Sequence, residues 1–203
     1  MIATDDAMQL IAPTLDLPAG YGAALRRGGS PDNLRPAVAA QQLAQIAGDP
    51  EGFCAGFDDP RGQGGPVTRP DGRRVARPPS IRRWIWDDGI CGTIGLRWQT
   101  GTEALPPGCP GHVGYAVVPW RRGEGLATAA LRAVLPPARA VGLRWIEVTT
   151  DPGNAPFRRV IVKAGGVFAA PDPLPRATGG RDAVHYRIAL SAEGGGGGTG
   201  SAR

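Results

Sequence analysis

The segment IRRWIWDDGICGTIGLRWQ, residues 81–99, constrains the fold of this chain more than any other segment. Two runs rich in aromatic and β-branched residues flank Asp87, Asp88 and Gly89. That turn composition favours an antiparallel β-hairpin. A third apolar run, HVGYAVV at 112–118, follows after a linker rich in Gly and Pro. Three consecutive strands of this kind exclude a fold that alternates strand and helix from its beginning.

Helix-like segments precede and follow these strands. Before the hairpin, the pattern predicts a strand at 8–14, an amphipathic helix at 15–28 and a second helix that begins at Pro36. After the third run, it predicts a helix from Leu126 that Pro136 and Pro137 interrupt, a strand at 143–150, a helix at 155–166 and a strand at 183–190. This order predicts the α/β class, in its mixed α+β form, with a central mixed sheet and helices packed against it.

The length of 203 residues and a hydrophobic content of 41% favour a single domain. We assign residues 1–190 to that domain, with an irregular insertion at about 49–80 that is rich in Gly, Pro, Asp and Arg. The Gly-rich tail, 191–203, is expected to be disordered because it has little apolar surface to bury. No apolar stretch approaches the length of a membrane span and the N-terminus lacks a secretory pattern, so we expect a cytoplasmic protein without a membrane partner.

Cysteine spacing and charge exclude two further classes of function. Cys54, Cys91 and Cys109 are odd in number and form no C-x-x-C pair, which argues against a disulfide framework and against a metal site. The net charge of +5 is spread along the chain, and no nucleic-acid recognition motif is visible. We therefore expect neither a bound metal nor a nucleic-acid partner, and an anionic ligand fits the charge.

The stretch VVPWRRGEGLATAALRAV, residues 117–134, joins a strand to a helix through a turn with two glycines. The first amides of a helix have no intrahelical partner and carry a partial positive charge, so an anion can bind there. Gly123 and Gly125 let a phosphate approach the backbone, and Arg121 and Arg122 add charged donors. The turn therefore predicts a phosphorylated ligand, most simply a diphosphate.

Two familiar phosphate-binding motifs fit this turn less well. A P-loop requires a G-x-x-x-x-G-K-[ST] run, which the sequence lacks. A dinucleotide-binding fingerprint is the stronger rival, because Gly123 and Gly125 form G-x-G and Glu147 follows about 20 residues later. However, Thr128 stands where the third glycine belongs, and a hairpin precedes the strand. A nicotinamide-dependent oxidoreductase is therefore the weaker hypothesis.

Two motifs resemble those of the GNAT acetyltransferases. Residues 122–127 resemble the family signature [QR]-x-x-G-x-[GA], and 117–119 supply the V-x-P element before it as VVP. Residues 154–165 resemble the family segment N-x-x-S-x-R-V-I-x-K-x-G. The resemblance covers the chain except its tail. It implies a sheet of about six to seven strands, splayed between the fourth and fifth strands and flanked by about four helices, and it implies acetyl-CoA as the cosubstrate of an N-acetyltransferase.

The resemblance also implies how acetyl-CoA would bind. The backbone of Val117 and Val118 would pair with the pantetheine arm, and Asn154 would contact the same arm or order the site. Arg159 would lie near the adenosine phosphates. The pyrophosphate would be held by the turn, whose cofactor-binding residues are Arg121, Arg122, Gly123, Glu124, Gly125, Leu126 and Ala127.

Catalysis in this family would need a polarised thioester carbonyl and a base for the acceptor, a small molecule or peptide with a primary amine. The amide of Val117 or Val118 would polarise the carbonyl. His112 and Glu103 are the candidate bases. The alternatives are a partly buried strand histidine with a satisfied hydrogen bond and a solvated loop carboxylate. Ile161 stands where the family carries a tyrosine that protonates the thiolate, and Phe157 replaces a small residue.

The missing tyrosine leaves a second hypothesis open, a non-catalytic module of the same fold that binds acyl-CoA as a sensor. A homodimer also stays open. On the hairpin, Trp84, Trp86 and Trp98 either line the acceptor cleft or, more commonly for aromatic residues at strand spacing, belong to the core.

Overall fold

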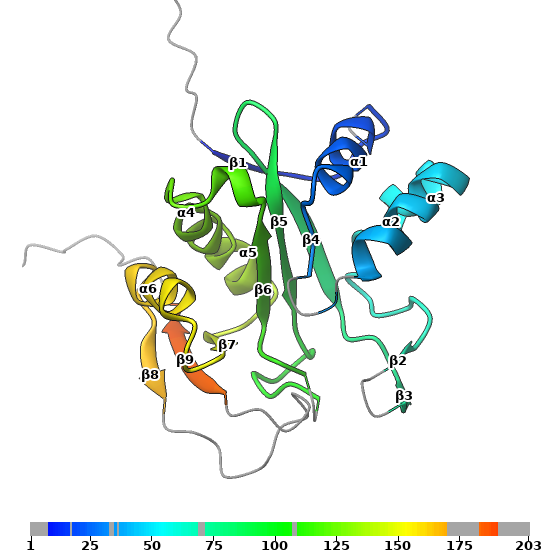
Figure 1. Ribbon diagram of the computed structural model, residues 1–203. Helices are drawn as coiled ribbons and strands as arrows, with labels where there is room; N and C mark the ends of the chain where they lie inside the picture. The colour runs from blue at the N-terminus through cyan, green and yellow to red at the C-terminus, as the bar shows by residue number, and fades with distance from the viewer. Residues whose placement is uncertain are drawn as a thin grey trace, which may run out of the picture.

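A computed structural model of the protein describes residues 8–16, 18–32, 35, 37–68, 72–106, 109–169 and 183–190 (Figure 1). The tail at 191–203 and the expected helix start at Pro36 lie outside the described residues. Nine strands and seven helical segments appear in the described part. The helices are α1 (Pro18–Arg26), α2 (Ala37–Gly48), α3 (Pro50–Ala55), the 3₁₀ turn η1 (Pro119–Arg121), α4 (Leu126–Ala133), α5 (Leu135–Ala140) and α6 (Ala155–Lys163).

Helices and strands together confirm the mixed α/β class, and the described strands form two main sheets. The first has the order β1-β4-β5-β6 and comprises β1 (Gln9–Ile11), β4 (Ser80–Trp86), β5 (Ile90–Arg97) and β6 (Val113–Val117). The second has the order β7-β9-β8 and comprises β7 (Trp145–Thr150), β9 (Val184–Ala189) and β8 (Val167–Ala169). All pairings within the described sheets are antiparallel. The sheets divide between β6 and β7, where the splay was expected.

The hairpin that dominates the sequence pattern forms as predicted. β4 pairs with β5 from Ser80↔Arg97 to Trp86↔Ile90, and the turn between them contains Asp88 and Gly89, both with positive φ. The predicted interruption of the helix that begins at Leu126 is also confirmed. The chain leaves α4 at Val134 and begins α5 at Leu135, because the prolines that follow fit a first helical turn but not a helix interior.

Some short elements were not predicted. Within residues 49–80 the structure has α3, whose N-cap Asp49 accepts a hydrogen bond from the N–H of Gly52 over 2.8 Å. The same segment contains a two-stranded ribbon of β2 (Val67–Thr68) and β3 (Arg74–Val75), and β8 is a further addition. Strands of two or three residues and a helix of six residues, less than two turns, are too short to display a clear hydrophobic period.

Two buried clusters fill the space between the sheets and the helices. Figure 1 shows α1, α2 and α3 on one side of the first sheet and α4, α5 and α6 on the other. The smaller cluster joins Trp84 of β4 to Tyr21 of α1 and to Phe53 and Phe57. The larger one contains Trp98 and the apolar faces of α4 and α6. Trp84 and Trp98 are therefore core residues. No helix in the described part of the chain is long and apolar enough to cross a membrane.

Candidate active site

The glycine turn between η1 and α4 is open to solvent. Gly123 and Gly125 have φ of +87° and +85°, a conformation that other L-residues adopt at a cost. A side chain at either position would have no neighbouring atom within 4 Å. Gly125 is also the N-cap of α4, and no side chain caps this helix. Both glycines therefore serve the backbone conformation of the turn and leave its surface uncovered.

A row of backbone amides lines this turn. Among the described residues, the N–H groups of residues 122–127 donate to no protein acceptor, whereas the next amide, of Thr128, bonds to the carbonyl of Gly125 over 2.9 Å. Gly123, Glu124 and Gly125 are exposed. Unpaired amides at the N-terminus of a helix, where the helix dipole is positive, provide donors for an anion.

The two valines before the turn direct their amides in opposite directions. The N–H of Val118 donates to the carbonyl of Cys91 on β5 over 2.9 Å, so it is already paired. Because backbone groups alternate along an antiparallel strand, the N–H of Val117 points away from β5 and toward the gap beside β7. The carbonyl of Val117 accepts a hydrogen bond from Nε of Arg122 over 3.1 Å. Val117 thus presents its amide to the gap, and Val118 does not.

The gap between β6 and β7 closes at His112. The N–H of His112 donates to the carbonyl of Glu147 over 2.7 Å, and the N–H of Glu147 donates to Nδ1 of His112 over 2.9 Å. An isolated bridge links Gly111 to Val148 at the same level. The His112 side chain is 1% exposed, and burial lowers its pKa to about 4. This geometry favours a structural role for the imidazole at the closed end of the gap.

Glu103 lies in the loop before His112, beside the start of β7. Its Oε1 and Oε2 accept hydrogen bonds from Nε and Nη2 of Arg144 over 2.6 and 3.2 Å. These bonds lower the pKa of Glu103 to about 2. A carboxylate with such a low pKa is a weak base, so its geometry favours tying the loop to β7.

The Arg121 side chain forms hydrogen bonds to two carboxylates. Its Nε donates to Oε2 of Glu124 over 2.7 Å, and its Nη2 donates to Oδ2 of Asp87 over 2.5 Å. The guanidinium therefore lies against the β4–β5 hairpin. Sequence reasoning missed Asp87 as a partner of this site, because it read the residue only as part of a hairpin turn.

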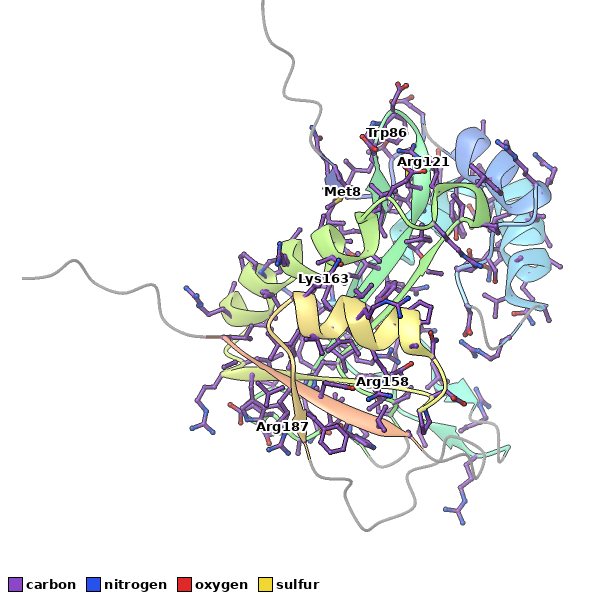
Figure 2. All side chains as sticks on the ribbon, turned by 60° about the vertical axis from the view of Figure 1, so that its left-hand side comes forward. Met8, Trp86, Arg121, Arg158, Lys163 and Arg187 are labelled. Carbon is purple, nitrogen blue, oxygen red and sulfur yellow. The ribbon has the colours of Figure 1, made fainter. Side chains whose placement is uncertain are left out.

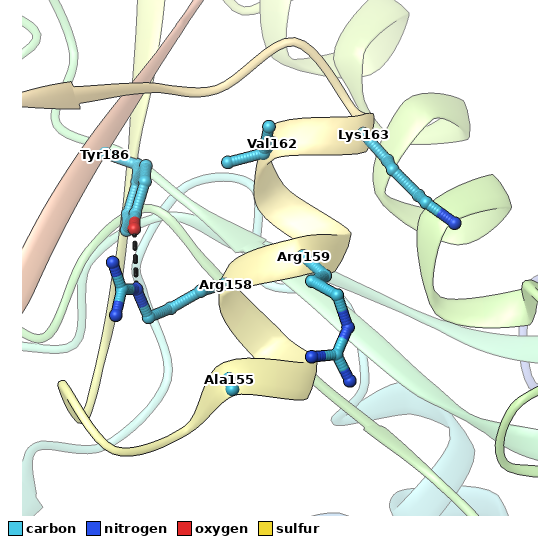
Figure 3. A pocket seen from close by; sticks show the side chains of 6 residues that line it. All are labelled: Ala155, Arg158, Arg159, Val162, Lys163 and Tyr186. Carbon is cyan, nitrogen blue, oxygen red and sulfur yellow. Dashed lines mark hydrogen bonds between the residues drawn. The ribbon is translucent and has the colours of Figure 1, made fainter.

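The helix α6 supplies the other predicted contacts. Oδ1 of Asn154 accepts a hydrogen bond from the N–H of Phe157 over 3.1 Å and so caps the helix. Arg159 is exposed on the same helix, and its guanidinium has no acceptor among the described residues. Arg159 borders a shallow pocket of about 420 Å³. Figure 3 shows the side chains that line it, which belong to Ala155, Arg158, Arg159, Val162, Lys163 and Tyr186.

A core residue, Ile161, occupies the position at which the family carries a proton-donating tyrosine. Ile161 is 0% exposed and packs within the larger cluster. Beside it, the ring of Phe157 stacks on Tyr115 of β6, with centroids 4.5 Å apart and an interplanar angle of 14°. Burial raises the pKa of Tyr115 above its ordinary value. The described residues bring together a turn with free amides, the Val117 amide and the N-terminus of α6, while His112 and Glu103 are engaged in structural contacts.

Comparison with known proteins gives a consistent family and fold. A family model described as an acetyltransferase (GNAT) domain matches residues 33–167. RimJ of Mycobacterium smegmatis, solved in complex with CoA-disulfide, is 22% identical with a TM-score of 0.59, and the match covers 90% of this chain and 81% of that one. MccE, a microcin self immunity acetyltransferase solved with acetyl-CoA and AMP, is 10% identical with a TM-score of 0.54 over 91% and 93% of the two chains. No curated protein matches the sequence.

Proposed function

The chain belongs to the GNAT acetyltransferase family, and from this premise we propose that it transfers an acetyl group from acetyl-CoA to a primary amine. The observation that carries the proposal is the row of unpaired amides at 122–127, at the N-terminus of α4 and beside the open part of the gap between β6 and β7. A diphosphate matches such donors in charge and in number of acceptor oxygens. This proposal replaces the weaker hypothesis, a nicotinamide-dependent oxidoreductase.

Acetyl-CoA fits the residues around the gap. The amides of 122–127 bind the pyrophosphate, and the Val117 backbone pairs with the pantetheine arm. Asn154 holds the start of α6 in place, and Arg159, which has no protein acceptor among the described residues, is available to an adenosine phosphate. Residues 1–190 form the catalytic domain, and its acceptor is a small molecule or a peptide. We expect the protein to act in the cytoplasm.

In the reaction, the amine nitrogen attacks the thioester carbonyl carbon, and the carbon–sulfur bond breaks. The amine loses one proton and the CoA thiolate gains one. The N–H of Val117 donates to the carbonyl oxygen as negative charge develops on it. Holding amine and thioester together supplies much of the acceleration. His112 and Glu103 are engaged in structural contacts, and Ile161 has no ionisable proton. We therefore assign both proton transfers to water, which takes a proton from the amine and gives one to the thiolate.

Ile161 also supports a second candidate function, a module that binds acyl-CoA without turnover. Its buried side chain leaves the family's tyrosine position without a titratable group. Calorimetry with CoA, followed by release of free thiol from acetyl-CoA in the presence of a panel of amines, separates the two. Binding with thiol release supports the transferase, and binding without release to any amine supports the module. The absence of CoA binding at millimolar concentration overturns both.

A further inference from the structure

The Arg121 side chain connects the glycine turn to the β4–β5 hairpin. Besides its bonds to Glu124 and to the Asp87 carboxylate, Nη1 donates to the carbonyl of Asp87 over 3.0 Å and lies 3.2 Å from Sγ of Cys91. Figure 2 labels Arg121 and also Trp86, the last residue of β4, which directly precedes Asp87 in the chain. All three guanidinium nitrogens thus have a protein partner. The two carboxylates raise the pKa of Arg121, the larger effect coming from Glu124, so the side chain stays charged.

Glu124 presents an electrostatic problem at this site. It lies in the turn, within the row of amides that binds the diphosphate, and its side chain is 43% exposed. A carboxylate that reached toward the bound phosphates would repel them, because both groups carry negative charge. The bond from Nε of Arg121 holds the Glu124 carboxylate on the side of the hairpin instead.

Asp87 holds the Arg121 guanidinium, which in turn holds Glu124, against the β4–β5 hairpin. Its carboxylate and its carbonyl both accept hydrogen bonds from Arg121, so the guanidinium is anchored to the hairpin turn before it reaches Glu124. The anchor is part of a long, paired hairpin, which gives it a fixed position. A rigid support for a binding residue reduces the ordering that the ligand must bring about.

We propose that Arg121 is a positioning residue for acetyl-CoA, which holds the Glu124 carboxylate out of the diphosphate site and ties the glycine turn to the β4–β5 hairpin. The inference rests on the proposed function, since it presupposes a diphosphate at the turn. It differs from a direct role, in which Arg121 itself binds a phosphate. The two roles predict opposite effects when its partner Asp87 is changed.

The test is a cycle of variants in which CoA affinity is measured by calorimetry and folding by thermal unfolding. Arg121→Ala releases Glu124 and weakens CoA binding about tenfold or more. Glu124→Gln binds CoA at least as well as the wild type. In the double variant, which combines Arg121→Ala with Glu124→Gln, the affinity for CoA recovers to within about threefold of that of Glu124→Gln. The loss in Arg121→Ala shrinks in 0.5 M salt, which a purely structural defect does not show.

Asp87→Asn is a second variant, needed if Arg121→Ala fails to fold. The amide of asparagine still accepts a hydrogen bond but carries no charge, so the anchor is weakened. A weaker anchor lowers the affinity for CoA if Arg121 positions the turn, and raises it if the released guanidinium binds phosphate. A double variant as weak as Arg121→Ala, with a wild-type melting temperature, overturns the inference, as does an Arg121→Ala variant that binds like the wild type. If the wild type itself binds no CoA, the proposed function fails first and takes this inference with it.

Discussion

The backbone N–H of Glu147 donates to Nδ1 of His112 over 2.9 Å at the level where β6 and β7 part. Since this bond uses the unprotonated nitrogen of a neutral ring, and burial lowers the His112 pKa to about 4, the fold resists protonation. An unfolded chain protonates near pH ~6.5. The contribution of His112 to stability is therefore complete above about pH 6.5 and is lost as the pH falls toward 4, by at most ~3 kcal/mol.

Urea unfolding of the wild type at pH 7, 5 and 4 measures this loss. His112→Asn is the matched control, because its amide oxygen can accept from the Glu147 N–H but does not titrate in this range. We expect the variant to be less stable than the wild type at pH 7 and to lose less stability on acidification. Equal losses in the two proteins contradict the assignment of this pH dependence to His112.

Glu103 gives a prediction about activity. Its carboxylate is held by Arg144 with a pKa of about 2, so at neutral pH it has little tendency to take a proton from an ammonium group. We expect Glu103→Gln to change kcat/KM for acetyl transfer by less than about threefold, whereas removal of a general base costs on the order of 10²–10⁴-fold. Steady-state thiol release over pH 6 to 9 is the measurement. A hundredfold loss would restore Glu103 as the catalytic base.

The fold was predictable where its signals are local and long. The β4–β5 hairpin combines apolar strands with a turn at Asp88 and Gly89, and the break before α5 follows from consecutive prolines. By contrast, β8 has three residues and β2 has two, so neither displays a period that a sequence pattern can reveal. Such short elements depend on partners that the tertiary fold brings to them.

The same distinction applies to the site. The free amides of 122–127 follow from a glycine turn that opens a helix, which is a local feature. The roles of Arg121 and His112 depend on partners 34 and 35 residues away, Asp87 and Glu147. Residue type alone indicated that Arg121 binds a phosphate and that His112 acts as a base. The distances to their protein partners show instead that both side chains are held in structural contacts.

Gly125 tests whether the turn backbone is essential. Its φ of +85° penalises any residue with a Cβ, although a side chain there meets no atom within 4 Å. We expect Gly125→Ala to lower the free energy of unfolding by about 1 to 2 kcal/mol and to weaken CoA binding. Gly65→Ala is the control, because Gly65 is equally uncrowded and has no positive φ. Calorimetry and urea unfolding of both variants check the prediction, and equal behaviour of the two contradicts it.

Ile161 tests whether the family's tyrosine can be restored. The side chain is fully buried in the larger cluster, and Gly166 lies so close that a Cβ there would be 2.4 Å from Cγ2 of Ile161. A phenol at this position is larger and brings a hydroxyl into an apolar site, so Ile161→Tyr should cost about 1 to 3 kcal/mol of stability without raising kcat. Ile161→Val, which only removes a methylene, should cost about 0.5 to 1.5 kcal/mol and leave kcat unchanged. Urea unfolding and thiol-release kinetics measure both effects. Faster transfer by a stable tyrosine variant would show that position 161 reaches the thioester and would return proton donation to α6.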